Sequence, residues 1–241
     1  MKEDTGWRKN KYGGLFNIFK KKEKQDTNKY MNERIREKVI ASKIIENNYD
    51  YDEGEQDFIE KNTNIIYDNC VKTDEQVQAI YEWTRDDTGY GSADYINEHL
   101  KEEHGLYYEI ARQKADIVES CINQTLNSDT IVFHGGDYEA NQLFKDNEIE
   151  IKGLLATSLS KSLASNFAVK KNGITMKLHA RSGLEALYIG EKTSFTDHTG
   201  KIKNEQELLF KSGHKIRIIY AEKLYDKSGN FMNWDVEGDI I

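Results

Sequence analysis

The sequence predicts an α+β protein in which helices come first and a sheet of short strands follows. In the first half of the 241-residue chain, apolar residues recur at helical spacing. From Thr130 onward the apolar period changes to two, which is typical of strands. Strands and helices do not alternate as βαβ units, so we expect a mostly antiparallel or mixed sheet with the helices packed on it.

Four helices are expected before the strands begin. Residues 28–47 carry apolar residues at helical spacing, and an acidic stretch at 50–57 is expected to be a solvated loop or a helix start. Thr73 and Gln76 form a capping-box pattern that predicts a helix start at Asp74. A short helix is expected over 93–100, and a longer one from Leu106 to near Asn127.

The strands are expected to be short and separated by turns. Gly135 and Gly136 are expected to end the first of them. A helix is expected over 160–169, between two of the strands. The expected strands cover residues 130–133, 149–151, 153–158, 174–180, 186–189, 205–210 and 215–224.

Charge and composition exclude several classes of protein. The net charge of −8 argues against a general nucleic-acid binder. No apolar run approaches the roughly 18 residues that a membrane-spanning helix needs. The first residues lack the apolar segment of a Sec signal peptide, so we expect secretion or injection by a non-Sec route, virion association, or a cytoplasmic location. Cys70 and Cys121 are expected to be buried free thiols, and the six histidines do not cluster, so no metal site is expected.

Composition divides the chain into three parts. Residues 1–27 are rich in Lys and Arg and are expected to form a basic flexible tail. The apolar residues 15–19, followed by three lysines, leave open a docking or membrane-surface role for this tail. Residues 28–73 are expected to form a helical extension, and 74–241 the functional domain.

Three segments carry chemically capable side chains, and each also has a plain structural reading. His134 at a strand end suits a satisfied core histidine, and Thr157-Ser158 suits a helix N-cap. Glu205 and Glu207 are two apart in an expected strand, so both carboxylates are expected on one face, where each perturbs the other's pKa. A glycine-rich dinucleotide fingerprint is missing, which excludes a Rossmann-type NAD site.

Taken in order, these segments resemble the R-S-E class of mono-ADP-ribosyltransferases, which includes the clostridial C2- and C3-like toxins and related phage-encoded enzymes. Residues 80–84 and 90–100 look like the family's opening helix and its Asn-x-x-Leu segment. Phe133-His134-Gly135 matches the aromatic-Arg-Gly strand, and Ala156-Thr157-Ser158 matches the Ser-Thr-Ser strand. Glu205-Gln206-Glu207 matches the Glu-x-Glu motif, and the likeness covers about 74–224.

This resemblance implies a split mixed β-sandwich with NAD in its cleft. It implies that Glu207 holds the nicotinamide ribose and stabilises the oxocarbenium-like ribosyl group, while Glu205 orients and deprotonates an arginine acceptor on a target protein. Ser158 completes the implied catalytic set. The implied target-recognition loop spans about 192–204 and includes Phe195. The implied NAD contacts are His134, Gly135, Ala156, Thr157, Phe167, Tyr90 and Asn97.

Two positions depart from the family pattern. His134 stands where the family has an arginine that contacts the NAD phosphates, and an imidazole lacks the permanent charge and five donors of a guanidinium. Ala156 stands at the first serine, which helps to position the catalytic glutamate. The predicted function is an NAD-dependent protein-arginine ADP-ribosyltransferase. The alternatives are an NAD glycohydrolase, an inactive NAD- or protein-binding module, and a structural protein such as a virion or secretion component.

Overall fold

The computed structural model describes residues 51–85, 89–137, 147–168, 173–193, 204–225, 228 and 231–241. Contacts group Asp50–Ile241 into one compact unit. The expected helix over 28–47, the basic tail and most of the expected recognition loop lie outside the described residues, so their predicted roles stay predictions. The division of the chain at residues 27 and 73 also stays a prediction. None of the described helices is long and apolar enough to cross a membrane.

The helices precede the sheet, as expected. The Thr73 hydroxyl accepts the Gln76 N–H, and the Gln76 side chain accepts the Thr73 N–H, which confirms the predicted capping box. The acidic stretch at 50–57, expected to be a solvated loop or a helix start, lies in a helix from Tyr51 onward. The described helices are α2 (Tyr51–Lys61), η2 (Thr63–Ile65), α3 (Tyr67–Cys70), α4 (Asp74–Trp83), α5 (Ala93–His99), η3 (Leu100–Glu102), α6 (Leu106–Cys121) and α8 (Lys161–Ser165).

Two helix ends differ from the expectation. Helix α6 ends at Cys121 rather than near Asn127, because Gln124–Thr125 forms strand β1 and pairs with strand β6. Helix α8 ends at Ser165, well before Val169. In both cases the apolar spacing predicted a longer helix than the structure has.

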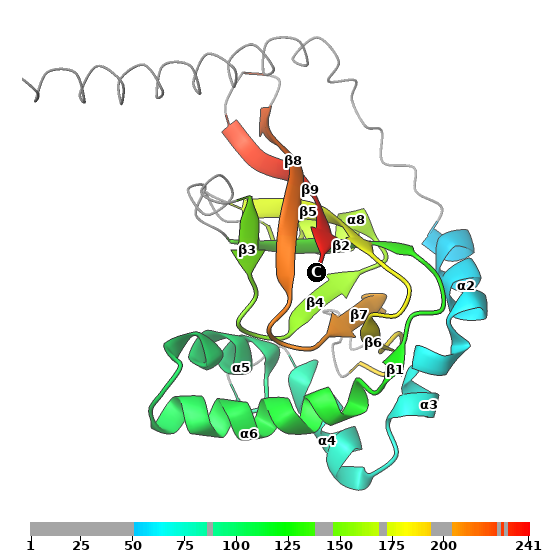
Figure 1. Cartoon of the computed structure of the whole chain (residues 1–241), viewed down its shortest axis with the longest axis vertical. Helices are drawn as coiled ribbons and strands as arrows, with labels where there is room; N and C mark the ends of the chain where they lie inside the picture. The colour runs from blue at the N-terminus through cyan, green and yellow to red at the C-terminus, as the bar shows by residue number, and fades with distance from the viewer. Residues whose placement is uncertain are drawn as a thin grey trace, which may run out of the picture. The chain divides into compact units, whose positions relative to one another are not determined.

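The strands form one mixed sheet in the order β1-β6-β7-β4-β2-β5-β9-β8-β3 (Figure 1). Strands β5 and β9 are parallel, and every other adjacent pair is antiparallel. The predicted α+β fold with a mixed sheet is therefore confirmed. The strands are β1 (Gln124–Thr125), β2 (Thr130–Asp137), β3 (Glu148–Glu150), β4 (Leu155–Ser158), β5 (Gly173–Ala180), β6 (Glu185–Tyr188), β7 (Glu207–Phe210), β8 (Lys215–Tyr225) and β9 (Phe231–Ile240).

Strand β2 continues through the two glycines that were expected to end it. Gly135 pairs with Thr175 and Gly136 with Ile174 in the ladder to β5. The glycine at 135 is required by close packing, because a Cβ there would lie 1.8 Å from the carbonyl oxygen of Ala164 in α8. The prediction of a break was wrong because a glycine in a strand can mark a close approach instead of a turn.

The sheet divides into two halves where β2 meets β4. These strands share a single register pair, Phe133 with Ser158, whereas β2 and β5 pair along eight residues. Apolar side chains from both halves, including Val132, Met176, Leu208 and Phe210, pack into one core cluster. The described sheet is thus folded into a sandwich that is split at the β2–β4 junction.

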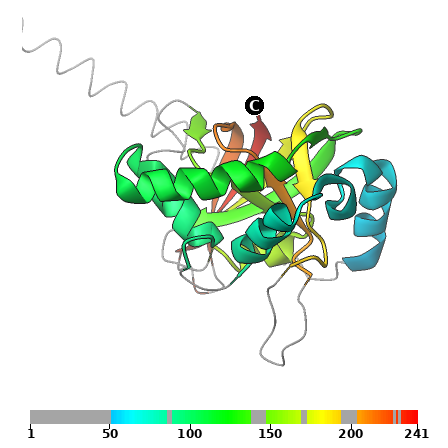
Figure 2. The ribbon, with the colours of Figure 1, turned by 90° about the horizontal axis from the view of Figure 1, so that it is seen from below.

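Helices α4, α5 and α6 cover the outer face of the β4-β7-β6 half (Figures 1 and 2). Their buried side chains, including Ile80, Trp83 and Ile96, join Leu187 and Leu209 in a second core cluster. Strand β7 is therefore buried on both faces, with Leu208, Leu209 and Phe210 at 0% exposure. A strand enclosed in this way holds its first residue, Glu207, in a fixed position.

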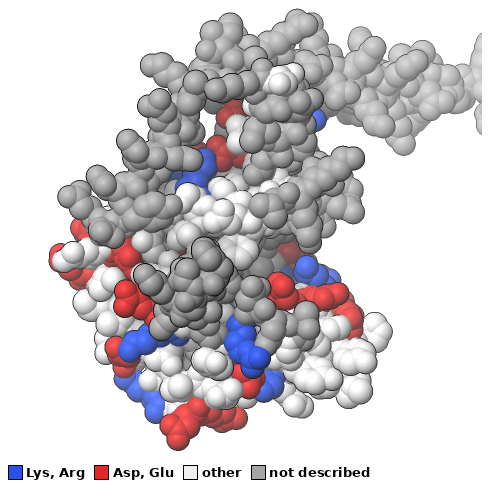
Figure 3. Space-filling model, turned by 180° about the vertical axis from the view of Figure 1, so that it is seen from behind, with Lys and Arg blue, Asp and Glu red and all other residues white. Residues whose placement is uncertain are grey.

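The face seen from behind carries charges of both signs. Figure 3 shows Lys and Arg side chains interspersed with Asp and Glu over its lower part. Ion pairs among the described residues include Lys114–Glu82 at 3.0 Å and Lys211–Glu185 at 2.6 Å. The described surface in this view has no single-sign charge field.

Candidate functional site

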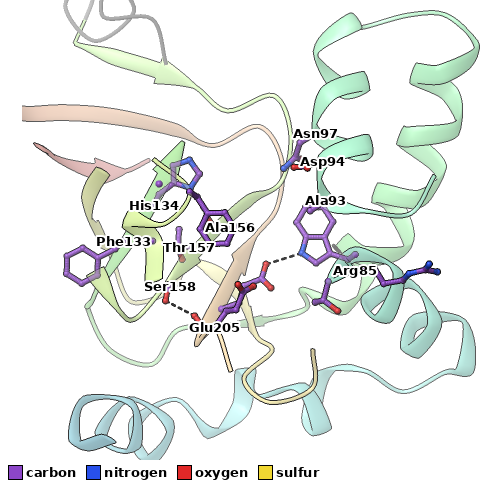
Figure 4. A pocket seen from close by; sticks show the side chains of 16 residues that line it. Arg85, Ala93, Asp94, Asn97, Phe133, His134, Ala156, Thr157, Ser158 and Glu205 are labelled. Atoms are coloured by element: carbon purple, nitrogen blue, oxygen red, sulfur yellow. Dashed lines mark hydrogen bonds between the residues drawn. The ribbon is translucent and has the colours of Figure 1, made fainter. Parts of the chain in front are cut away.

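A pocket opens at the β2–β4 junction, between the split sheet and helices α4 and α5 (Figure 4). Every predicted site residue except Tyr90 lines it. The residues around it come from six separate segments of the chain. They are Trp83, Thr84, Arg85, Ala93, Asp94, Asn97, Phe133, His134, Gly135, Ala156, Thr157, Ser158, Ala164, Phe167, Glu205 and Glu207.

Glu207 is the first residue of β7 and pairs in register with Ser158. Its Oε1 atom accepts a hydrogen bond of 3.0 Å from the indole Nε1–H of Trp83, a side chain that is 1% exposed (Figure 4). Burial raises the pKa of Glu207 to about 7; the Trp83 hydrogen bond lowers it, and the charge of Glu205 raises it. The pocket therefore holds a carboxylate whose charge changes near neutral pH.

Glu205 does not lie in the strand, so the expectation that it shares a strand face with Glu207 was wrong. Strand β7 starts at Glu207, and Gln206 has a φ of 50° in the left-handed region. A left-handed residue breaks the two-residue alternation, because it turns the chain instead of extending it. The turn still leaves both carboxylates in the pocket wall. Their predicted mutual effect is present in the raised pKa of Glu207, although burial is its main cause.

Ser158 contacts the backbone of this turn. Its hydroxyl donates to the carbonyl oxygen of Glu205 at 2.6 Å and accepts the Ser160 N–H at 3.0 Å. Ser160 in turn caps α8 by accepting the Leu163 N–H. Ser158 therefore fixes the turn that carries Glu205, and in this structure it does so through the main chain.

Thr157 and Ala156 support the pocket from β4. The Thr157 hydroxyl, 4% exposed, donates to the Leu208 carbonyl oxygen at 2.6 Å and holds β4 against β7. The Ala156 carbonyl oxygen lies 2.7 Å from Nδ1 of His134. The Thr157 bond joins β4 to β7 within one half of the sheet, and the His134 contact joins β2 to β4 across the split.

His134 is a neutral imidazole of fixed orientation. The carbonyl oxygen of Ala156 can only accept, so Nδ1 carries the proton and Nε2 is the unprotonated ring nitrogen. Burial lowers the pKa of His134, and the Ala156 hydrogen bond opposes that effect. Near neutral pH, His134 therefore brings a polar ring to the pocket but no positive charge.

Asn97 lines the pocket and acts on the neighbouring backbone. Its amide nitrogen donates to the Leu154 carbonyl oxygen at 3.1 Å, and its Oδ1 accepts the Leu154 N–H at 2.9 Å. Gly153 allows this approach, because a Cβ there would lie 2.2 Å from Asn97 Oδ1. Asn97 thereby holds the entry to β4 against α5.

Tyr90 and Phe167 are exposed aromatic residues near the pocket. Tyr90 is 61% exposed, lies outside the pocket lining, and packs edge-on against Tyr95 with ring centroids 5.1 Å apart. Phe167 follows α8, is 57% exposed and lines the pocket. The ring of Phe167 is therefore accessible to a molecule bound in the pocket. Tyr90 could contact only a ligand that extends beyond the residues lining the pocket.

The residues of the pocket wall that were not among the predicted site residues are Trp83, Thr84, Arg85, Ala93, Asp94, Phe133 and Ala164. Trp83 is 124 residues from Glu207 along the chain, and only the fold brings them together. In Figure 4 the Arg85 guanidinium extends away from Glu205. The available signal is the position of Trp83 inside the segment 80–84, which resembles the family's opening helix. Among the described residues, no group of three or more His, Cys, Asp or Glu side chains is placed to hold a metal ion.

No protein-family model matches this sequence, and no curated protein matches it. Several solved structures do. Plx2a, an ADP-ribosyltransferase toxin from Paenibacillus larvae, matches with a TM-score of 0.57 and 17% identity over 78% of this chain and 94% of that chain. C3stau2 from S. aureus, solved with NAD, matches with a TM-score of 0.55 and 15% identity over 77% of this chain and 95% of that chain. The Clostridium limosum C3 exoenzyme matches with a TM-score of 0.54 and 18% identity over 79% of this chain and 94% of that chain.

The described chain has the ADP-ribosyltransferase fold. Within that class, the solved structures that it resembles include C3-like toxins. The predicted resemblance is thereby confirmed at the level of the fold. Because the identities are only 15–18%, the likeness shows the fold, and the function has to be argued from the pocket.

Proposed function

We propose that this protein is an NAD-dependent mono-ADP-ribosyltransferase that modifies arginine on a target protein and releases nicotinamide. The observation that carries the proposal is Glu207, a carboxylate held by a buried Trp83 N–H in the pocket at the split of an ADP-ribosyltransferase fold. The similar C3stau2 structure was solved with NAD, which supports NAD as the substrate. The proposed NAD contacts are His134, Gly135, Ala156, Thr157 and Phe167, with Asn97 holding the wall and Tyr90 at its margin.

Glu207 is assigned to the bond-breaking step. As the bond between ribose C1′ and the nicotinamide nitrogen breaks, its electron pair leaves with nicotinamide and positive charge develops on the ribose. A fixed carboxylate in a partly buried pocket stabilises that charge with little reorganisation. Trp83 supports this role in two ways: its N–H fixes one carboxylate oxygen, and it favours the charged form of Glu207 over the neutral form.

Glu205 is assigned to the acceptor. A guanidinium is protonated at neutral pH and becomes a nucleophile only when a base removes a proton. The Glu205 carboxylate takes that proton as the guanidine nitrogen forms its bond to C1′. Ser158 holds the Glu205 backbone in place through its hydroxyl. Arginine as the acceptor depends on Glu205 alone.

The departures from the family pattern at His134 and Ala156 are the reason to consider the alternative functions. A neutral His134 cannot pair with the phosphates of NAD as a guanidinium does, and loss of such a contact costs about 1.5–3 kcal/mol. That corresponds to roughly tenfold to a few hundredfold in affinity. Weak NAD affinity with intact glutamates gives a slow transferase or an NAD glycohydrolase, in which water replaces arginine. A pocket that binds NAD without turnover gives a non-catalytic module.

The test uses NAD labelled in its adenosine half, with agmatine or an arginine-rich protein mixture as acceptor. The wild-type protein is expected to label the acceptor, Glu207→Ala to lose both labelling and nicotinamide release, and Glu205→Gln to keep nicotinamide release while losing labelling. Glu150→Gln, an exposed carboxylate in β3, is the matched control. Equal background labelling by wild type and Glu207→Ala would overturn the transferase proposal. Nicotinamide release without labelling in the wild type would favour the glycohydrolase.

A further inference from the structure

Helix α2 reaches the turn that carries Glu205 through one side chain, Glu55. Glu55 Oε1 accepts a hydrogen bond from the Asn204 side-chain amide at 2.9 Å. Glu55 Oε2 accepts one from the Gln206 side-chain amide, also at 2.9 Å. The Tyr188 hydroxyl donates to Oε1 as well. One carboxylate thus receives donors from both sides of Glu205 and from strand β6.

The turn at 204–206 needs such support. Gln206 is 7% exposed and has a φ of 50°, a conformation that residues with a Cβ rarely adopt. Its N–H donates to the Asn204 Oδ1 at 2.8 Å, and its carbonyl oxygen accepts the Leu159 N–H at 3.1 Å. A left-handed residue of this kind persists only where the surroundings fix it. Glu55 supplies the side-chain part of that fixation.

Glu55 is itself held firmly relative to the sheet. Phe58, one turn further along α2, is 5% exposed and packs edge-on against the Tyr188 ring, with centroids 5.3 Å apart. At the end of the helix, the buried Asn62 accepts the Asn127 N–H through Oδ1 at 2.9 Å. Two contacts further along the chain therefore hold α2, and with it the Glu55 carboxylate, opposite the turn.

We propose that Glu55 is a positioning residue that sets the direction in which Glu205 presents its carboxylate to the acceptor. This inference rests on the proposed function, since it assigns Glu55 to the transfer half of that reaction. It also makes α2 part of the active-site scaffold, although the helix precedes the segment whose motifs indicated the function.

The two glutamates should respond differently to the loss of Glu55. Glu207 is held by Trp83 and by its register pairing with Ser158, neither of which involves α2. Glu205 lies between the two residues that Glu55 binds. Removing Glu55 should therefore impair arginine modification more than it impairs cleavage of NAD.

The experiment compares full-length wild type, Glu55→Ala, Glu55→Gln and Glu60→Ala. Glu60 is an exposed carboxylate on the same helix and serves as the matched control. Two quantities are measured: the ratio of agmatine modification to NAD hydrolysis, and hydrogen exchange of the backbone amides at 204–207. In Glu55→Ala the ratio is expected to fall roughly tenfold to a hundredfold, as expected for a misplaced catalytic group. Exchange at the turn is expected to rise.

Glu55→Gln keeps one acceptor oxygen, so its ratio and its exchange rate are expected to lie between those of wild type and Glu55→Ala. Glu60→Ala should match wild type in both quantities. Unchanged exchange in Glu55→Ala would overturn the inference, because the turn would then hold without Glu55. Faster exchange with an unchanged ratio would also overturn it, since the role would be structural only. A wild-type protein that does not turn over NAD contradicts the proposed function and the role of Glu55 in transfer together. The exchange data then still decide whether Glu55 holds the turn.

Discussion

At the scale of single residues, the pKa of Glu207 reflects opposing influences. Burial and the charge of Glu205 disfavour its charged form, and the Trp83 N–H favours it, with a resulting pKa of about 7. The proposed chemistry needs the charged form, because it stabilises positive charge on the ribose. The fraction of Glu207 that is ionised is therefore expected to limit the reaction near neutral pH.

This gives a pH dependence of defined sign. In the ligand-free protein Glu207 is mostly protonated below pH 6 and mostly ionised above pH 8, on either side of its pKa of about 7. We expect kcat/KM for NAD to rise with pH through about 7 and to level off above it, with about a tenfold loss per unit well below the midpoint. A profile of nicotinamide release between pH 5 and 9 tests this. A flat profile in that range would contradict the assignment of Glu207.

Trp83→Phe tests the indole N–H while keeping an aromatic ring in the core. Loss of a donor that favours the carboxylate should move the acid limb of the profile to higher pH. At pH 7 we expect kcat/KM to fall roughly tenfold or more, the cost of a hydrogen bond to a charged group. Trp234→Phe, in β9 and away from the pocket, is the matched control. A uniform loss at every pH would indicate that Trp83 acts only through packing.

At the scale of elements, the pocket depends on how closely β2 approaches α8. Gly135→Ala would place a Cβ 1.8 Å from the Ala164 carbonyl oxygen, so α8 has to shift. We expect a loss of about 1–3 kcal/mol in the free energy of unfolding, as for other overpacked sites. Phe167 follows α8, so NAD binding should weaken as well.

Chemical denaturation and an NAD titration measure the two effects of Gly135→Ala. The control is Gly54→Ala on α2, where an added Cβ meets nothing within 4 Å. It should leave stability unchanged or slightly raised. If Gly135→Ala behaved like Gly54→Ala, the close packing of β2 on α8 would not be needed for the pocket.

The sequence predicted those elements that are marked by a local signal, either a cap formed by residues close in the chain or a strong apolar period. The capping box at Thr73 and the alternating strand at 174–180 were found in this way. Strand β9 was missed, because Asn, Asp and Gly disfavour strands and only its pairing with β5 and β8 holds it. The position of Glu205 was wrong because spacing cannot reveal the left-handed Gln206. The contact of Trp83 with Glu207 and that of Glu55 with the turn at 204–206 arise only from tertiary structure.

At the scale of the whole molecule, the residues just before 74 contribute to the cores. Phe58 and Ile65 belong to the sandwich core, and Cys70 belongs to the core under the helices. Contacts place Asp50–Ile241 in one compact unit. This arrangement argues for a folding unit that starts near residue 50.

Two truncations test that boundary. A chain of residues 50–241 is expected to unfold cooperatively with a Tm within a few degrees of the full chain. A chain of residues 74–241 loses the buried Phe58 and Ile65, each worth about 2–5 kcal/mol when truncated in a core, and should be strongly destabilised. Thermal unfolding followed by circular dichroism measures both. A shorter chain as stable as the longer one would place the boundary at 74.

The central claim is that the pocket cleaves NAD with Glu207, and nicotinamide release tests it most directly. Wild type, Glu207→Gln and Glu150→Gln are incubated with NAD at pH 8, where Glu207 is ionised. Glu207→Gln keeps the size of the side chain and removes its charge. We predict a loss of about a hundredfold to a thousandfold in Glu207→Gln, the usual effect of removing a group that stabilises transition-state charge, and none in Glu150→Gln. Equal rates of nicotinamide release from all three proteins would contradict the claim.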